Sequence, residues 1–215
     1  QQLAREALAE RAADLAEQLG AQAEREKQVA SHLNHAEAMD QQARDNLRKE
    51  APALAQSLRS AQQKISKAAA ASRAPAAQPP LYEAQKKLYQ AADATDATAK
   101  GSASQPLRKL AQELNDNAGE IEKSSREIAE GMALLPSSET TAAQDAGRQT
   151  RETAGREAEL AEEMKQAARA AELAQNDALA STGDRKSLEA EVKAAIQALE
   201  QQGGLPSKAQ AEMAA

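Results

Sequence analysis

The two histidines are the first residues to test for chemistry, because imidazole both binds metal ions and transfers protons. His32 and His35 lie three residues apart on a predicted helix, with Glu37 and Asp40 nearby, so one helix face could present two imidazoles to a metal ion. The spacing matches neither His-Glu-x-x-His nor the Glu-x-x-His pattern of dimetal bundles, and it fixes no third ligand. We therefore interpret both histidines as surface residues and expect no metal site.

Haem ligation and acid–base catalysis are the next chemistries to consider. His35 and Met39 are one helical turn apart, but the two haem ligands of a bundle would have to come from different helices, and no Cys-x-x-Cys-His motif is present. The acidic pairs Glu162-Glu163 and Glu157 with Glu159 point in different directions on a helix, which is typical of a solvated face. The chain has no cysteine, and no set of nucleophile, base and orienting residue can be assembled. We expect no catalytic residue, no cofactor and no small-molecule substrate.

The segment 51–80 is the only one with a net positive charge, since it contains four cationic side chains and no acid. These are Arg59, Lys64, Lys67 and Arg73. A basic helix beside a proline-rich linker can dock on an anionic membrane or on nucleic acid. Without aromatic residues to stack on bases we expect no nucleic acid. We favour charge complementarity with acidic helices of the same bundle and retain peripheral membrane contact as the alternative.

Composition favours helices over a thick globular core. Of the 215 residues 41% are hydrophobic, but 55 residues are alanine, and Tyr82 and Tyr89 are the only aromatic residues. We expect the tyrosines at the core or its rim, with a contact surface as the alternative. Such a composition is typical of long helices and coiled coils, and it would also suit a partly disordered chain. The modest net charge of −6 and the high helix propensity of alanine favour an ordered bundle.

The most regular pattern lies between residues 107 and 135, where a large aliphatic residue recurs every seven positions. The five residues are Leu107, Leu114, Ile121, Ile128 and Leu135. Mostly small residues follow four positions after each, which predicts a helix with one apolar stripe that must pack against another helix. The predicted partner is the alanine-lined stripe over 160–178, which begins with Leu160 and Met164.

Prolines and glycines divide the chain into six expected helices, with residues 1–73 and 81–202 as two parts. The helices cover 1–50, 51–73, 81–99, 106–135, 139–181 and 184–202, with the first break near 50–52. Residues 74–80 read as an extended linker or hinge, and 203–215 as a flexible tail. Short loops favour antiparallel neighbours, so the predicted fold is all-α, an elongated antiparallel helical bundle or coiled coil without a sheet.

Residues 124–131, Ser-Ser-Arg-Glu-Ile-Ala-Glu-Gly, resemble the Ser-Ser-x-Glu-Ile-Ala-x-Gly stretch in signalling helices of bacterial methyl-accepting chemotaxis proteins. That resemblance implies a long coiled-coil helix. Pro136 falls where that family keeps its helix unbroken, so we interpret the match as convergence on one heptad style. The run from 140 to 172 is similar in composition to late-embryogenesis-abundant repeats, which would imply a stress-protective chain.

These patterns predict a non-enzymatic helical spacer or protein-interaction module of a larger bacterial protein, whose partners are helices of other copies or subunits. Only 31 large aliphatic residues are available to bury the stripes, which is consistent with homo-oligomerisation. The alternatives are an anionic-membrane-binding module and a partly disordered stress-protective chain. No run approaches the roughly 18 apolar residues of a membrane span. Since the sequence begins Gln1-Gln2 without Met, we interpret it as a mature product or a piece of a longer chain, and cytoplasm and periplasm both stay open.

Overall fold

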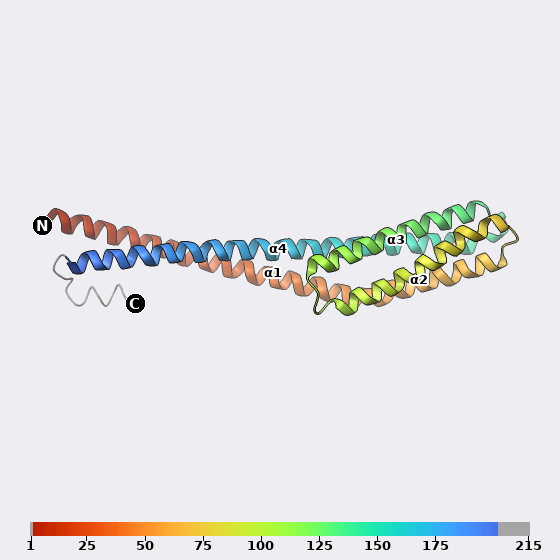
Figure 1. The fold of residues 1–215 in the computed structure, drawn as a ribbon, viewed down its shortest axis with the longest axis horizontal. Coiled ribbons are helices and arrows are strands. Elements are labelled where there is room, and N and C mark those ends of the chain that lie inside the picture. The colour runs from red at the N-terminus through yellow and green to blue at the C-terminus, as the bar shows by residue number, and fades with distance from the viewer. Residues whose placement is uncertain (1, 202–215) are drawn as a thin grey trace. The chain divides into compact units, whose positions relative to one another are not determined.

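The computed structural model describes the backbone of residues 2–201, and the side chains of that range apart from 2–6, 8, 9, 138 and 199–201. Four α-helices account for most of it: α1 (Gln2–Ala71), α2 (Gln78–Gly101), α3 (Leu107–Ala133) and α4 (Thr141–Gln201) (Figure 1). Two short 3-10 helices, Pro75–Ala77 and Ser137–Glu139, precede α2 and α4. No strand occurs within residues 2–201, so the prediction of an all-α bundle is confirmed. The predicted tail 203–215 lies outside the described residues.

Residues 2–201 form four long helices and not six, because two expected breaks do not occur. Helix α1 continues through Pro52, although proline lacks an N–H and costs about 3 kcal/mol inside a helix. Ala51 and Ala55 on either side are fully buried while Pro52 itself is exposed, so packing holds the helix together and the ring faces water. Helix α4 likewise continues through Gly183, where glycine costs only about 1 kcal/mol relative to alanine.

The proline-rich segment 74–80 is not the extended linker that its composition predicts. Pro79 and Pro80 lie in the first turn of α2, where a helix needs no N–H donor from them. The backbone N–H of Ala74 donates to Ser72 Oγ at 3.1 Å, and that of Ala77 donates to the carbonyl of Ala74 at 3.0 Å. Ala77 is also fully buried, so this connection is a tight and ordered turn.

The chain divides into two compact units at positions other than those predicted. The four-helix unit comprises residues 37–171, which include α2, α3 and one part each of α1 and α4. Among the described residues, the two-helix unit comprises 2–36 of α1 and 172–201 of α4.

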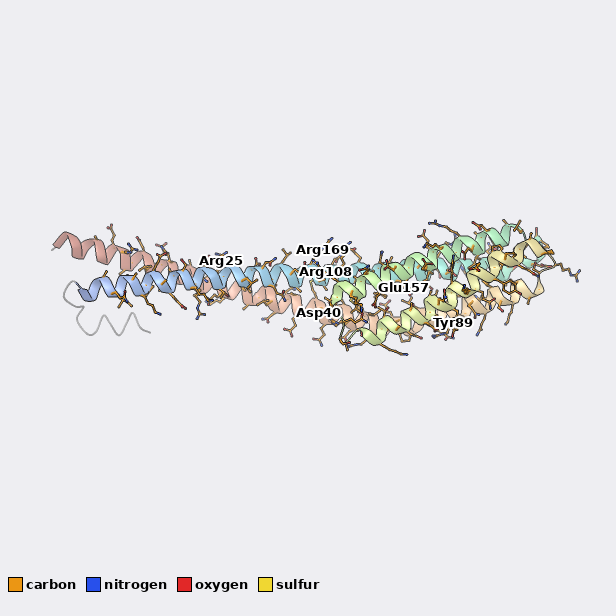
Figure 2. The ribbon with its side chains drawn as sticks, viewed as in Figure 1. Arg25, Asp40, Tyr89, Arg108, Glu157 and Arg169 are labelled. Carbon is orange, nitrogen blue, oxygen red and sulfur yellow. The ribbon has the colours of Figure 1, made fainter. Side chains whose placement is uncertain are left out.

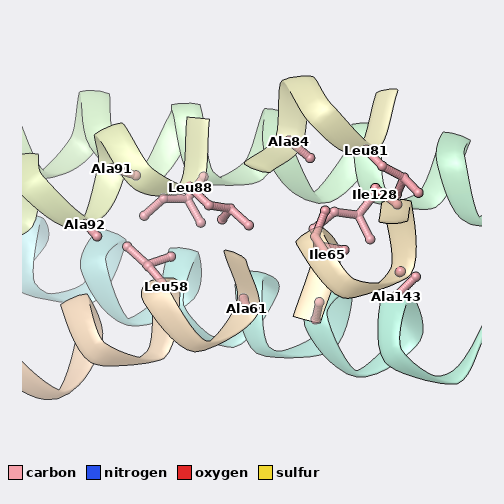
Figure 3. Packing of buried hydrophobic residues seen from close by; sticks show 14 of the residues in the cluster. Leu58, Ala61, Ile65, Leu81, Ala84, Leu88, Ala91, Ala92, Ile128 and Ala143 are labelled. Atoms are coloured by element: carbon pink, nitrogen blue, oxygen red, sulfur yellow. The ribbon is translucent and has the colours of Figure 1, made fainter. Parts of the chain in front are cut away.

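Two hydrophobic clusters form the core of the four-helix unit, and more than half of the buried apolar residues in the described chain are alanine. The first cluster joins residues 55–69 of α1 and 81–92 of α2 to α3 and α4 (Figure 3). The second cluster joins 43–51 of α1 to 107–114 of α3 and 160–168 of α4.

All seven residues of the predicted seam are buried. Ile121, Ile128 and Leu135 lie in the first cluster, where the α4 residues lie between 143 and 154. The remaining four, Leu107, Leu114, Leu160 and Met164, lie together in the second cluster. The stripe on α4 that packs with α3 therefore covers 143–168. The predicted stripe, 160–178, was wrong at both ends. Since α3 and α4 are antiparallel, the neighbours of residues 121–135 must come from an earlier part of α4.

Side chains of α1 fix the turn between α2 and α3. Arg44 donates through Nη1 to the carbonyl of Gln105 at 3.0 Å and also to the carbonyl of Ser102. Arg48 Nε donates to Ser102 Oγ at 3.0 Å. Since these carbonyls follow the end of α2, the Arg44 guanidinium supplies donors that the helix itself cannot, and Arg48 holds the Ser102 side chain.

The two-helix unit is an antiparallel pair with few buried side chains. Gln22 Nε2 donates to the carbonyl of Ser181 at 2.9 Å, while Asp177, earlier on α4, lies 3.1 Å from His32, later on α1. Among the described side chains of this unit, the buried ones are Leu15, Ala36, Ala174, Ser181 and Leu188.

Candidate functional site

A polar layer separates the two hydrophobic clusters of the four-helix unit, and it is built around Glu157 of α4. Glu157 is labelled in Figure 2. Glu157 lies between Ala154 of the first cluster and Leu160 of the second. Thr95 follows the last α2 residue of the first cluster, and Asn117 of α3 lies between residues 114 and 121, which belong to different clusters. Three helices thus place one polar side chain each at the same level of the core.

The Glu157 side chain is fully buried, and both of its carboxyl oxygens have hydrogen-bond partners. Asn117 Nδ2 donates to Oε2 at 2.7 Å, and the Thr95 hydroxyl bonds to Oε1. The same Asn117 nitrogen lies 3.0 Å from Thr95 Oγ1 and 3.1 Å from the carbonyl of Ala91, which Thr95 Oγ1 also contacts at 2.9 Å. These side chains and one carbonyl therefore form a closed network inside the bundle.

Burial raises the pKa of Glu157 from 4.5 to about 7, although the hydrogen bonds from Thr95 and Asn117 act in the opposite direction. The network can also accommodate the neutral acid. A protonated Oε1 can donate to Thr95 Oγ1, which leaves the threonine hydroxyl hydrogen for the carbonyl of Ala91. When Glu157 is ionised, that single hydrogen must serve either Glu157 or Ala91.

A carboxyl group with a pKa near neutrality has the proton affinity of a general acid or base. Glu157 has no exposed surface, however, so a substrate in solution has no access to it. The arrangement can bind and release a proton and can couple that event to the packing of α2, α3 and α4.

Sequence reasoning missed this site, because it interpreted Glu157 and Glu159 as a solvated pair. Glu159 is exposed, whereas Glu157 is completely buried. A signal was present in the spacing: Glu157 precedes the buried Met164 by seven residues and follows the buried Thr150 by seven. Extending the apolar stripe of α4 by one heptad toward the N-terminus would have placed a carboxyl group in the core.

The four basic residues proposed for an anionic surface do not act as one group. Arg59 Nη2 lies 2.5 Å from Asp96 and 3.4 Å from Asp93, both on α2. Lys64 Nζ donates to Gln149 Oε1 of α4 at 3.2 Å. The other two residues, Lys67 and Arg73, are exposed.

The remaining candidates from the sequence lie at the surface. His32 Nδ1 is 3.1 Å from Asp177 Oδ2, and His35 is exposed. Among the described side chains no three His, Asp or Glu residues are grouped so that they could hold a metal ion. Tyr82 and Tyr89 are 53% and 58% exposed on α2, so neither fills the core. Tyr89 is labelled in Figure 2.

A second candidate site is the apolar surface of the two-helix unit. Four leucines of this unit are exposed: Leu19 (46%), Leu33 (39%), Leu173 (66%) and Leu179 (71%). The four-helix unit exposes only Leu134 among its described leucines.

None of the described helices combines the length and the apolar character that crossing a membrane requires. The chain matches no protein-family model, no curated protein and no solved structure.

Proposed function

We propose that this chain is a non-enzymatic helical spacer and protein-interaction module, in which the four-helix unit is the stable part and the two-helix unit associates with helices of a second copy. Coiled-coil pairing is the proposed mode of association. The module would belong to a larger bacterial protein, for which the alanine- and glutamine-rich composition is the argument.

The observation that carries this proposal is the set of four exposed leucines, Leu19, Leu33, Leu173 and Leu179. Fully burying a leucine contributes about 1.5–3 kcal/mol relative to leaving it exposed. Four partly exposed leucines therefore offer several kcal/mol, which is the amount needed to offset the loss of free motion on association. Other helices with apolar stripes are the partners that such a surface fits.

A second copy is the favoured partner because each copy presents the same leucines on two helices. Two such pairs can form a bundle of four helices. The four-helix unit of this same chain shows what that number achieves, since ten of its eleven leucines are buried or half-buried. The membrane alternative is less favoured, since Arg59 and Lys64 already contact side chains of the bundle.

Sedimentation velocity of the full chain tests the proposal. We expect the weight-average mass to rise with concentration, and a Leu19→Gln, Leu179→Gln double variant to remain monomeric at concentrations where the wild type associates. Leu134→Gln is the matched control, because Leu134 is 49% exposed in the four-helix unit. A wild type that stays monomeric throughout, or a control that dissociates as readily as the double variant, would overturn the proposal.

A further inference from the structure

We propose that the polar layer of the four-helix unit is a proton-dependent latch, in which Glu157 holds a proton while α2, α3 and α4 are tightly packed, and loss of that proton loosens their packing. This inference does not depend on the proposed association of the two-helix unit, because the residues involved all lie within 37–171.

The first argument is the position of the carboxyl group. Glu157 is fully buried, and its partners Thr95 and Asn117 are 0% and 8% exposed. The carboxyl group is therefore shielded from bulk water and takes its hydrogen bonds from the protein. Its neighbours along α4 in the core, Ala154 and Leu160, are apolar. An isolated carboxylate in such surroundings is costly unless a cation pairs with it.

The second argument is the absence of such a cation among the described side chains that bond to Glu157. Its hydrogen-bond partners are the neutral side chains of Thr95 and Asn117. The charged residues that bracket this layer are Glu50 and Arg59 on α1, Asp93 and Asp96 on α2, Asp116 and Glu120 on α3, and Arg156 and Glu159 on α4.

These bracketing charges are directed to the surface and mostly neutralise one another. Arg156 binds Glu50 through two bonds of 2.5 Å and also contacts Glu159 at 2.6 Å. Arg59 pairs with the two aspartates of α2, Glu120 pairs with Lys123, and Asp116 is exposed. None of them offsets the burial of Glu157, whose pKa is shifted upward by desolvation.

The third argument is the hydrogen-bond count of the network. In the protonated state every donor finds an acceptor: Glu157 to Thr95, Thr95 to the carbonyl of Ala91, and Asn117 to Glu157 and Ala91. In the ionised state the Thr95 hydroxyl donates to Glu157 and the carbonyl of Ala91 keeps the bond from Asn117, so the network has one hydrogen bond fewer around a buried charge. Since a buried charge without a cationic partner is destabilising, the ionised state favours separation of α2 and α3 from α4 and entry of water.

The direction of the pH effect follows from the raised pKa. The stabilisation is fully present below the unfolded-state pKa of 4.5, and it is lost as the pH rises through the folded-state pKa of about 7. For this group alone, the folding equilibrium constant should be roughly 70-fold smaller at pH 8 than at pH 5.

Urea unfolding of the full chain at pH 5 and pH 8 tests the proposal with Glu157→Gln and the exposed control Glu152→Gln. Glutamine keeps the size of the side chain and cannot ionise. Between pH 5 and pH 8 the folding equilibrium constant of the wild type and of the control should therefore fall by roughly 70-fold more than that of Glu157→Gln. Equal pH dependence in the wild type and Glu157→Gln would overturn the proposal.

A second measurement keeps the test independent of any packing defect in the glutamine variant. The side-chain carboxyl carbon of Glu157 in the wild-type chain, followed by NMR, should titrate near neutral pH. Amide exchange in α2 and α3, corrected for its intrinsic pH dependence, should accelerate over the same interval. A carboxyl titration complete below pH 5, or exchange protection that does not change, would contradict the latch.

Discussion

The two units use the same two helices and differ in how many neighbours those helices have. In the four-helix unit Leu47 and Leu58 of α1 are completely buried, because α2, α3 and α4 surround that part of the helix. In the two-helix unit Leu19 and Leu33 of the same helix are 46% and 39% exposed. A heptad pattern thus indicates which face of a helix is apolar, while the number of packed neighbours determines how far that face is removed from water.

The largest expected effect comes from placing a charge in the four-helix core. Ile121 is fully buried, so Ile121→Asp should lower the free energy of unfolding by at least about 4 kcal/mol, since it removes apolar contacts and buries a carboxyl group. Loss of the cooperative thermal transition in circular dichroism would report this. Glu122→Gln on the exposed face should leave that transition unchanged, and a similar loss in both variants would refute the assignment of Ile121 to the core.

Gly→Ala substitutions should change the stability in opposite directions in the two units. A Cβ atom at Gly131 would lie 2.6 Å from Leu81 Cδ2 and 2.7 Å from its Cγ, and Leu81 is fully buried. Gly131→Ala should therefore destabilise the four-helix unit by about 1–3 kcal/mol.

Gly183 is the matched position in the two-helix unit, because a Cβ atom there meets nothing within 4 Å. Gly183→Ala should stabilise α4 by up to about 1 kcal/mol through helix propensity alone. The urea midpoint of unfolding should fall for Gly131→Ala and rise for Gly183→Ala. Destabilisation by Gly183→Ala would mean that the two-helix unit is packed more closely there than the structure indicates.

The smallest effect concerns ion pairs. Arg156 holds the pKa of Glu50 below its ordinary value of 4.5 through two short hydrogen bonds, so this pair stabilises the fold above that pH and its contribution disappears as the pH falls below it. Glu50→Gln should cost about 1 kcal/mol at pH 7, and this cost should shrink as the pH falls further below 4.5, as unfolding curves over this pH range would show.

Asp184→Asn provides the comparison in the two-helix unit. Arg25 and Asp184 lie 2.5 Å apart, but both side chains are 53% exposed. Water and salt screen such a pair, so its removal should cause no measurable change. An effect of Asp184→Asn as large as that of Glu50→Gln would argue against this difference between the units.

Much of the fold could be predicted from the sequence, because helix propensity and heptad spacing are local properties. The seam of α3 and the helical character of the whole described chain follow from such patterns. The ends of helices were harder: Pro52 and Gly183 weaken a helix by amounts that packing with distant residues outweighs, and no local pattern reports that packing.

The candidate site was harder still to predict. Glu157 occupies a heptad position that the neighbouring Met164 marks as internal, yet a carboxyl group is usually exposed, so composition argued against its burial. Its partners Thr95 and Asn117 come from other helices, and their position at the same level depends on the register of the bundle, which the sequence alone does not state.

The alanine-lined core has a consequence for the temperature dependence of the fold. Unfolding a core in which alanine outnumbers the larger apolar residues hydrates less apolar surface than unfolding a leucine-rich core of equal length. The heat-capacity change of unfolding should accordingly fall below the usual value of about 12–15 cal/mol/K per residue. The stability curve is then broad and shallow, so the helices of this chain should lose little stability on cooling, while the entropy of ordering the chain limits them on heating.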